Sequence, residues 1–124
     1  KGSLIVEDLA HMIFPEQLIV LGEYYGKTEE NMIITGRFSW KTLPELMIKH
    51  KVNVLLLPSV WPETFSYLAS EIIRAQYPLV CFNLGAQGEK VRTYHLGAVC
   101  DTVDAEHIHQ TAEALYHKIY SRNQ

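Results

Sequence analysis

Residues 52–83 read VNVLLLPSVWPETFSYLASEIIRAQYPLVCFN, and this stretch decides the fold. An apolar run at 52–58 ends on Pro58, and a second apolar run occupies 78–83. Residues 64–76, between the two runs, carry apolar side chains at helical spacing. Because strands that are apolar throughout are typical of parallel sheets covered on both faces, the stretch predicts a strand–helix–strand unit.

The same alternation of apolar runs and amphipathic segments continues along the rest of the chain. It predicts an open, Rossmann-like α/β fold, with a parallel sheet of about five strands and helices on both faces, in a single domain over residues 1–124. The expected strands are residues 17–22, 31–36, 52–58, 78–83 and 98–101, and the expected helices are residues 4–13, 42–51, 64–76, 88–97 and 104–121. Gly97 is expected to end the fourth of these helices.

Composition excludes several classes of protein. The chain has 124 residues, an apolar content of 48% and a net charge of −3 with scattered basic residues, which argues for a packed domain and against a nucleic-acid binder. No apolar run approaches the roughly 20 residues of a membrane span. The start, Lys1-Gly2-Ser3, leads into a mixed apolar and acidic segment, so no signal peptide is expected.

The residue types that most often bind metals do not cluster in the sequence. Cys81 and Cys100 each lie in a short apolar segment and are expected to be reduced core thiols of a cytosolic protein, rather than a disulfide or a metal pair. His107 and His109 are two residues apart in a predicted helix, so they point to different faces. No metal site and no cofactor are therefore expected.

Ligands of open α/β sheets bind outside the carboxyl ends of the strands. In this chain the rule points to four loops, residues 22–30, 36–40, 58–63 and 83–88. In the third loop, Trp61-Pro62 gives the backbone a stiff approach to the helix that follows, because proline restricts its own φ and the residue before it.

Two carboxylates flank the expected start of that helix. Glu63 or Thr64 is expected to begin the helix, whose first N–H groups lack intrahelical partners and form a ready phosphate site. The rise from Thr64 to Glu71 would be roughly 10 Å at ~1.5 Å per residue, so Glu63 and Glu71 could meet different parts of one elongated ligand. The expected buried stripe of the helix is Phe65, Leu68, Ala69 and Ile72.

Each of these residues also has a purely structural explanation. An acidic residue is favourable at a helix start without any ligand, and Glu71 with Arg74 is an ordinary i, i+3 surface pair. Trp61 alone fits a core or an interface aromatic. Taken one by one, the residues leave both explanations open.

A longer pattern favours the functional explanation. It comprises PSVWPETFSY at 58–67, Ser70-Glu71, AQYPLV at 75–80 and NLGA at 83–86, with IVLG at 19–22 and ITGRF at 34–38 upstream. This pattern resembles the carboxyl-terminal domain of a family 4-type retaining glycosyltransferase with the GT-B fold, over most of residues 17–101. Glutamates separated by seven residues, here Glu63 and Glu71, are a hallmark of that family. The WPETFSY variant resembles bacterial glycosyltransferases of surface-polysaccharide gene clusters.

The resemblance implies a role for each matching residue. Glu63 would be the catalytic residue that faces the hydroxyls of the donor sugar, and Glu71 would accept hydrogen bonds from the ribose. The backbone amides that would hold the donor diphosphate are those of Thr64, Phe65, Ser66 and Tyr67. The residues that would lie near the nucleotide base are Gly36, Arg37 and Phe38. Residues 83–88 would border the site, and Phe38 fits a core aromatic under the sheet edge equally well.

Lys1-Gly2 matches a further family motif, in which the lysine helps to neutralise the donor diphosphate. On this match Lys1 is a donor-binding residue, and the chain begins just after the first strand of the domain, without the arginine that precedes the lysine in the family. The alternative is that the two residues are a remnant of cloning.

The reaction that the resemblance implies is transfer of a hexosyl group from a nucleotide-diphosphate sugar to a glycan or lipid-linked acceptor, with retention at the anomeric carbon and without a metal. Acceptor groups are expected in an amino-terminal domain outside this chain, so the isolated chain is expected to be inactive and at most a weak donor binder. The full-length protein is expected in the bacterial cytoplasm, either free or peripheral at the inner membrane, with no transmembrane segment and no nucleic-acid partner.

A second interpretation comes from a different functional class. The chain would then be a non-catalytic, Rossmann-like docking module of a multidomain polysaccharide-assembly protein, with the motif residues retained as scaffold. A flavodoxin-like receiver or redox domain fits the predicted sheet but not the residues, because no acidic cluster follows an early strand and no phosphate loop for flavin is found.

Overall fold

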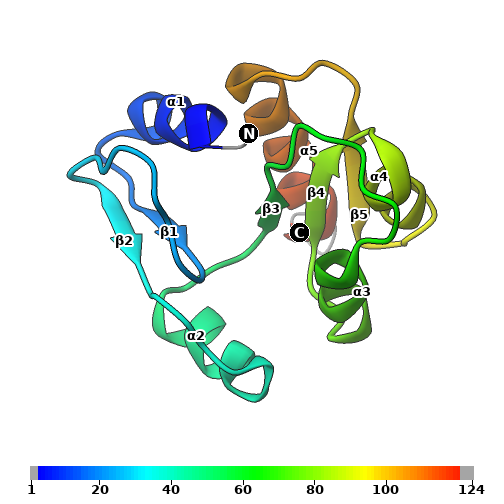
Figure 1. Cartoon of the computed structure of the whole chain (residues 1–124), viewed down its shortest axis with the longest axis horizontal. Helices are drawn as coiled ribbons and strands as arrows, with labels where there is room; N and C mark the ends of the chain where they lie inside the picture. The colour runs from blue at the N-terminus through cyan, green and yellow to red at the C-terminus, as the bar shows by residue number, and fades with distance from the viewer. Residues whose placement is uncertain (1–2, 121–124) are drawn as a thin grey trace. The chain divides into compact units, whose positions relative to one another are not determined.

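The computed structural model describes residues 3–120, in which helices and short parallel strands alternate (Figure 1). The elements are α1 (Ser3–Ile13), β1 (Leu18–Val20), β2 (Met32–Ile34), the 3₁₀ helix η1 (Trp40–Thr42), α2 (Leu43–Lys49), β3 (Leu55–Leu57), α3 (Tyr67–Arg74), β4 (Leu79–Phe82), α4 (Gly85–Arg92), β5 (Gly97–Cys100) and α5 (Ala105–Tyr120). The predicted α/β fold, with parallel strands in open sheets and flanking helices, is confirmed. The described chain forms two compact units, residues 3–53 and residues 54–120.

The strands of the described chain pair within these units and not in one continuous sheet. In the first unit β1 pairs with β2, with Leu18 opposite Met32. In the second unit the order is β3-β4-β5, with Leu79 of β4 between Leu55 and Gly97. Apolar runs indicate which residues form strands, but the order of pairing depends on tertiary contacts that short runs do not encode.

The core of the second unit surrounds the central strand β4, where all four residues are buried. The two successive crossovers, through α3 and α4, run from strand to neighbouring strand in the same direction, so both helices lie on the same face of the β3-β4-β5 sheet. Helix α5 packs against β4 and β5 on the opposite face, with Ile108 and Leu115 buried. Because both faces are covered, the strands carry continuous apolar residues, which is the pattern that predicted them.

The first unit has its own small core. The buried apolar residues of α1, β2 and α2 are Ile5, Leu9, Ala10, Met32, Leu43 and Met47. The buried side chain of Asn31 donates from Nδ2 to the carbonyl oxygens of Ala10 and Glu16, each at 2.8 Å. These two bonds tie the end of α1 to the strand β2 and satisfy backbone groups that would otherwise lack partners.

Both boundaries of α4 differ from the sequence prediction. Helix α4 spans Gly85–Arg92, three residues earlier at its start than the expected helix at 88–97, so residues 85–88 are helical and not part of a loop. Gly97 does not end this helix, because the helix ends at Arg92 with Thr93 as its C-cap, and Gly97 opens β5. A Cβ atom at Gly97 would lie 2.6 Å from the carbonyl oxygen of Val91, which explains the glycine by close packing.

The cysteines behave as core residues. Cys81 lies in β4 and Cys100 at the end of β5, and both are buried free thiols, as the sequence predicted. Among residues 3–120 no three histidine, cysteine or acidic side chains gather as a metal site would require. No helix in that range is long and apolar enough to cross a membrane.

Candidate functional site

The loop between β3 and α3 carries most of the predicted site residues. Helix α3 begins at Tyr67, with the buried Ser66 as its N-cap, and the Ser66 hydroxyl accepts a hydrogen bond from the Ala69 backbone N–H at 3.3 Å. The prediction that Glu63 or Thr64 begins the helix is therefore wrong. Serine is a stronger N-cap than threonine, and Ser66 lies two residues after Thr64, which was expected to begin the helix.

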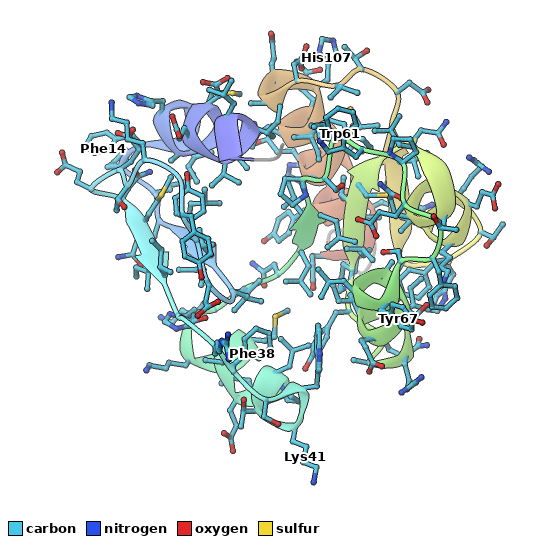
Figure 2. The ribbon with its side chains drawn as sticks, in the orientation of Figure 1. Phe14, Phe38, Lys41, Trp61, Tyr67 and His107 are labelled. Carbon is cyan, nitrogen blue, oxygen red and sulfur yellow. The ribbon has the colours of Figure 1, made fainter. Side chains whose placement is uncertain are left out.

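This later start changes which side chains are buried. Ala69 and Ile72 are buried, as predicted, but Phe65 is 51% exposed and Leu68 is 45% exposed. Phe65 precedes the helix, so the helical spacing that placed it on the buried stripe does not apply to it. Trp61 is 64% exposed and is not a core residue; it lies in the loop well before Tyr67, which opens α3 (Figure 2).

The segment between Glu63 and Ala69 presents a run of available backbone donors. Within residues 3–120, the N–H groups of Thr64 to Leu68 donate no hydrogen bond, whereas the neighbouring N–H groups of Glu63 and Ala69 are bound by side chains. Consecutive free N–H groups that lead into a helix carry partial positive charge and bind anions well. The segment therefore has the chemistry of a phosphate site.

The Glu63 carboxylate is half-buried and accepts no hydrogen bond from any residue between 3 and 120. Its charge acts on the buried thiol of Cys81 in β4. Burial raises the pKa of Cys81 to about 12, and the negative charge of Glu63 adds to that effect, while Arg92 opposes it. Glu63 is thus an uncommitted carboxylate next to the run of free N–H groups.

Glu71 is engaged within the protein. Its carboxylate lies 3.4 Å from the guanidinium of Arg74, so the i, i+3 surface pair that the sequence allowed is present. Only Tyr67 to Glu71 is helical in this stretch, which gives an axial rise of roughly 6 Å at ~1.5 Å per residue. The estimate of roughly 10 Å from Thr64 to Glu71 assumed a helix from Thr64, and that assumption does not hold for residues 64–66.

Helix α4 supplies two residues of this loop to which the sequence analysis gave no individual role, although Gln87 lies within residues 83–88, which were expected to border the site. Gln87 is fully buried and bonds to the backbone of Trp61 and Glu63. Lys90 holds its ammonium 3.2 Å from the centre of the Phe65 ring and donates to the Ser70 hydroxyl at 2.6 Å. The only sequence signal for Gln87 was a polar residue among small ones in LGAQG, and Lys90 carried no signal, since a lysine on a helix is usually solvated.

The residues expected near the nucleotide base lie in the first unit. Gly36 forms a bridge with Gly22, donating its N–H to the Gly22 carbonyl oxygen at 3.0 Å, and both glycines have positive φ. Arg37 pairs with Glu23 at 3.1 Å, and the ring of Phe38 meets Trp40 edge-on at 5.4 Å (Figure 2). The expected proximity of these residues to a base stays a prediction, and Lys1 lies outside the described residues.

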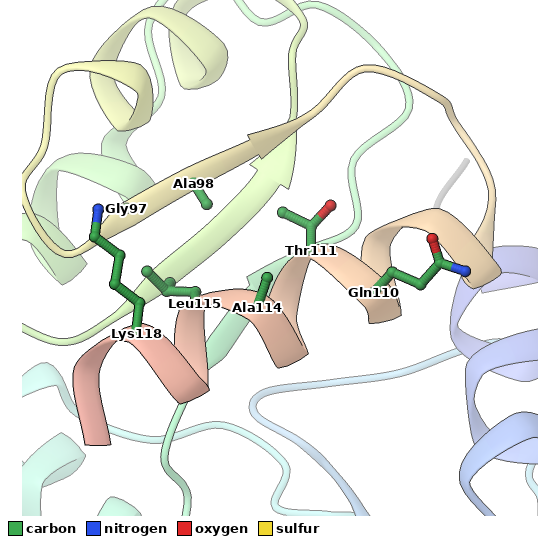
Figure 3. Close-up of a pocket in the computed structure, with 7 residues that line it drawn as sticks. All are labelled: Gly97, Ala98, Gln110, Thr111, Ala114, Leu115 and Lys118. Atoms are coloured by element: carbon green, nitrogen blue, oxygen red, sulfur yellow. The ribbon is translucent and has the colours of Figure 1, made fainter. Parts of the chain in front are cut away.

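A separate shallow pocket of about 370 Å³ lies between α5 and β5 (Figure 3). Its lining residues are Gly97, Ala98, Gln110, Thr111, Ala114, Leu115 and Lys118. None of these is a predicted site residue, and Lys118 is their only charged side chain. Because α5 covers the face opposite α4, this pocket is not part of the loop that carries Glu63.

Comparison with protein families matches residues 24–124 to the glycosyl transferases group 1. The chain belongs to this family. The match confirms the resemblance to family 4 glycosyltransferases and covers the loop, α3 and α4 described above. The same kind of comparison finds no match among curated proteins or among solved structures.

Membership of a glycosyltransferase family implies that the domain binds a sugar donor. The second unit of this glycosyltransferase domain brings together the residues predicted to contact that donor, namely Glu63, Thr64, Phe65, Ser66, Tyr67 and Glu71. The role of each of them stays a prediction.

Proposed function

We propose that the segment from Glu63 to Glu71 binds a nucleotide-diphosphate sugar, and that the full-length protein is a retaining hexosyltransferase of bacterial surface-polysaccharide biosynthesis. The observation that supports this most strongly is the run of N–H groups from Thr64 to Leu68, which have no acceptor within residues 3–120. The diphosphate of the donor fits that run, because it is the anionic group of such a substrate.

The roles proposed for the two glutamates follow from their surroundings. Glu63 has an uncommitted carboxylate beside the amide run, so it is available to the hydroxyls of the donor sugar. Glu71 lies one helical turn along α3 from Tyr67 and exchanges part of its pairing with Arg74 for the ribose hydroxyls when the nucleotide binds.

The proposed chemistry depends on stabilising the leaving group. As the bond between sugar and diphosphate breaks, negative charge grows on the diphosphate, and preorganised N–H dipoles stabilise that charge without reorganising. No metal is required for this step in the proposal. Acceptor binding is assigned to a second domain of the full-length enzyme, and the glycan or lipid-linked acceptor would enter from that side.

The buried free thiols Cys81 and Cys100 support a cytoplasmic location for the full-length protein, because reduced core cysteines are typical of reducing compartments. Whether the protein is free or peripheral at the inner membrane is decided by fractionating cells that express it.

The test is a sugar-transfer assay with the full-length enzyme and a panel of UDP-, GDP- and dTDP-sugars. We expect Glu63→Gln to lower kcat by at least roughly a hundredfold, because a contact made in the transition state is lost. The matched control is Glu113→Gln, an exposed position of α5 away from the loop, which should leave kcat unchanged. Full activity of Glu63→Gln would contradict the proposal, and no transfer from any donor would favour the docking-module alternative.

A further inference from the structure

The side chain of Gln87 connects α4 to the loop that carries Glu63. Its Oε1 accepts a hydrogen bond from the Glu63 backbone N–H at 3.0 Å, and its Nε2 donates to the Trp61 carbonyl oxygen at 2.8 Å. The side chain is fully buried, so both ends of the amide are satisfied by a segment 24 to 26 residues away in sequence. A buried amide that pairs with two backbone groups of one loop fixes the course of that loop.

The backbone of α4 holds the same loop through a further hydrogen bond and a close contact. The Ala86 N–H donates to the Glu63 carbonyl oxygen at 2.9 Å. Gly85 lies so close that a Cβ atom there would come within 2.6 to 2.8 Å of the backbone of Pro62 and Glu63. Both hydrogen-bonding groups of the Glu63 backbone are therefore bound by the first turn of α4.

The Glu63 carboxylate contrasts with its backbone. It accepts no hydrogen bond from residues 3–120, while the N–H and the carbonyl of the same residue are both held. This is the arrangement expected of a ligand-contacting side chain, in which neighbouring groups fix the main chain and the functional group stays available. Without Gln87, the Glu63 N–H would lose its partner in a partly buried loop, and the Trp61 carbonyl would keep only the bond from the Ser59 hydroxyl at 3.2 Å.

We propose that Gln87 is a positioning residue for Glu63, and that through it α4 sets the direction in which the Glu63 carboxylate meets the donor sugar. The inference rests on the proposed function for the identity of the ligand. The contacts between Gln87 and the loop do not depend on that function. It predicts that changes at Gln87 act on Glu63 and on the adjoining amides of Thr64 to Leu68, and leave the strand β4 unaffected.

The first test needs no ligand. In Gln87→Met, which keeps the length of the side chain but removes both polar atoms, amide hydrogen exchange at Glu63 should become at least roughly tenfold faster, since one buried hydrogen bond is lost. Exchange at Leu79 to Phe82 should be unchanged, because their strand bonds are elsewhere. Unchanged exchange at Glu63, or an equal acceleration in β4, would overturn the proposal.

A second variant separates the two bonds and guards against a general loss of folding. In Gln87→Glu an ionised side chain still accepts from the Glu63 N–H but has no proton for the Trp61 carbonyl, whereas the protonated acid has one. The carbonyl-carbon chemical shift of Trp61 should therefore return toward the wild-type value as the pH is lowered, while protection at Glu63 persists. A Trp61 shift that does not respond to pH would contradict the proposed pairing.

The third measurement connects the geometry to the ligand. UDP, GDP and dTDP are titrated into wild-type protein and Gln87→Met, and shifts of the Thr64 to Leu68 amides are recorded. We expect the affinity of the nucleotide that binds to fall by roughly tenfold in the variant, because the held geometry of the loop is lost. Equal affinity in the two proteins would overturn the positioning role. If no nucleotide shifts these amides in the wild-type protein, the proposed function fails, while the exchange result still decides whether Gln87 fixes the loop.

Discussion

Gly85 and Glu63, 22 positions apart, are in backbone contact: a Cβ atom on Gly85 would lie 2.6 Å from the backbone nitrogen of Glu63. Gly85 also has a φ of +49°, a conformation that residues with a side chain rarely adopt. The first residue of α4 is therefore a glycine for two independent reasons, and one of them, the close approach, concerns the loop that carries the predicted catalytic carboxylate.

Gly85→Ala is expected to lower the free energy of unfolding by more than about 2 kcal/mol, because backbone strain and a clash with a neighbouring backbone add together. The control is Gly22→Ala, where φ is +98° but nothing lies within 4 Å of the added Cβ atom. That change should cost only about 1–2 kcal/mol, the strain alone. Urea denaturation of both variants measures the difference, and equal losses would contradict the close contact.

Ser66→Ala is expected to destabilise the protein by about 1 kcal/mol, because the Ala69 N–H loses its capping oxygen at the start of α3. Ser66→Asp should recover part of this loss, since aspartate caps helices about as well as serine. Ser59→Ala is the comparison for a loop hydrogen bond outside the cap, because it removes the bond from the Ser59 hydroxyl to the Trp61 carbonyl oxygen at 3.2 Å. A loss at Ser59 as large as that at Ser66 would rule out capping as the cause.

Lys90→Met is expected to lower stability by about 0.5–2 kcal/mol, because it removes the ammonium from the face of Phe65 while keeping a chain of similar length. Lys90→Arg keeps the charge and should lose less. Thermal unfolding midpoints are measured for Lys90→Met and for Lys90→Arg, each alone and combined with Phe65→Leu. Together with the Phe65→Leu single variant, each set forms a double-mutant cycle. If the effects of Lys90→Met and Phe65→Leu are strictly additive, the two side chains do not interact.

Because the pKa of the Cys81 thiol is raised, we expect the protein to lose stability at alkaline pH. Because the pKa of this thiol is 9.0 in the unfolded chain and about 12 in the folded protein, the folded state holds the proton more tightly. The resulting stabilisation is complete below pH 9.0 and is lost as the pH rises toward about 12.

Urea denaturation between about pH 8 and about pH 11 measures this effect, because the linkage between pKa and stability places most of the change there. Burial also raises the pKa of Tyr94, so the comparison is with Cys81→Ala, which retains that tyrosine. The free energy of unfolding should fall more steeply with pH in the wild-type protein than in Cys81→Ala. Parallel pH profiles would show that Cys81 does not contribute.

The apolar runs at residues 52–58 and 78–83 were sufficient to predict the class of the fold. Strands buried on both faces leave an unmistakable pattern in sequence, and β4 is buried along its whole length. The start of α3 was not predicted correctly, because Thr64 and Ser66 are both good N-caps and only tertiary packing selects the second.

The sequence pointed to the loop that carries Glu63, but not to the contacts by which Gln87 and Lys90 hold that loop. The spacing of Glu63 and Glu71 is visible in sequence, so the loop could be identified before the structure was known. Gln87 and Lys90 act through contacts with residues 20 or more positions away, and no local pattern records such contacts. Glu63 could therefore be identified from a sequence motif, whereas the residues that hold its loop could be identified only from the structure.

The central claim is that the amides leading into α3 bind the diphosphate of a nucleotide-sugar donor. The most direct measurement is a titration of ¹⁵N-labelled protein with UDP-, GDP- and dTDP-sugars, following every backbone amide. We expect at least one donor to shift the amides of Thr64 to Leu68 in a saturable manner, and Glu63→Gln to weaken the interaction. The claim would be contradicted if none of the donors shifts these amides, or if the shifts occur only around Lys118 in the pocket between α5 and β5.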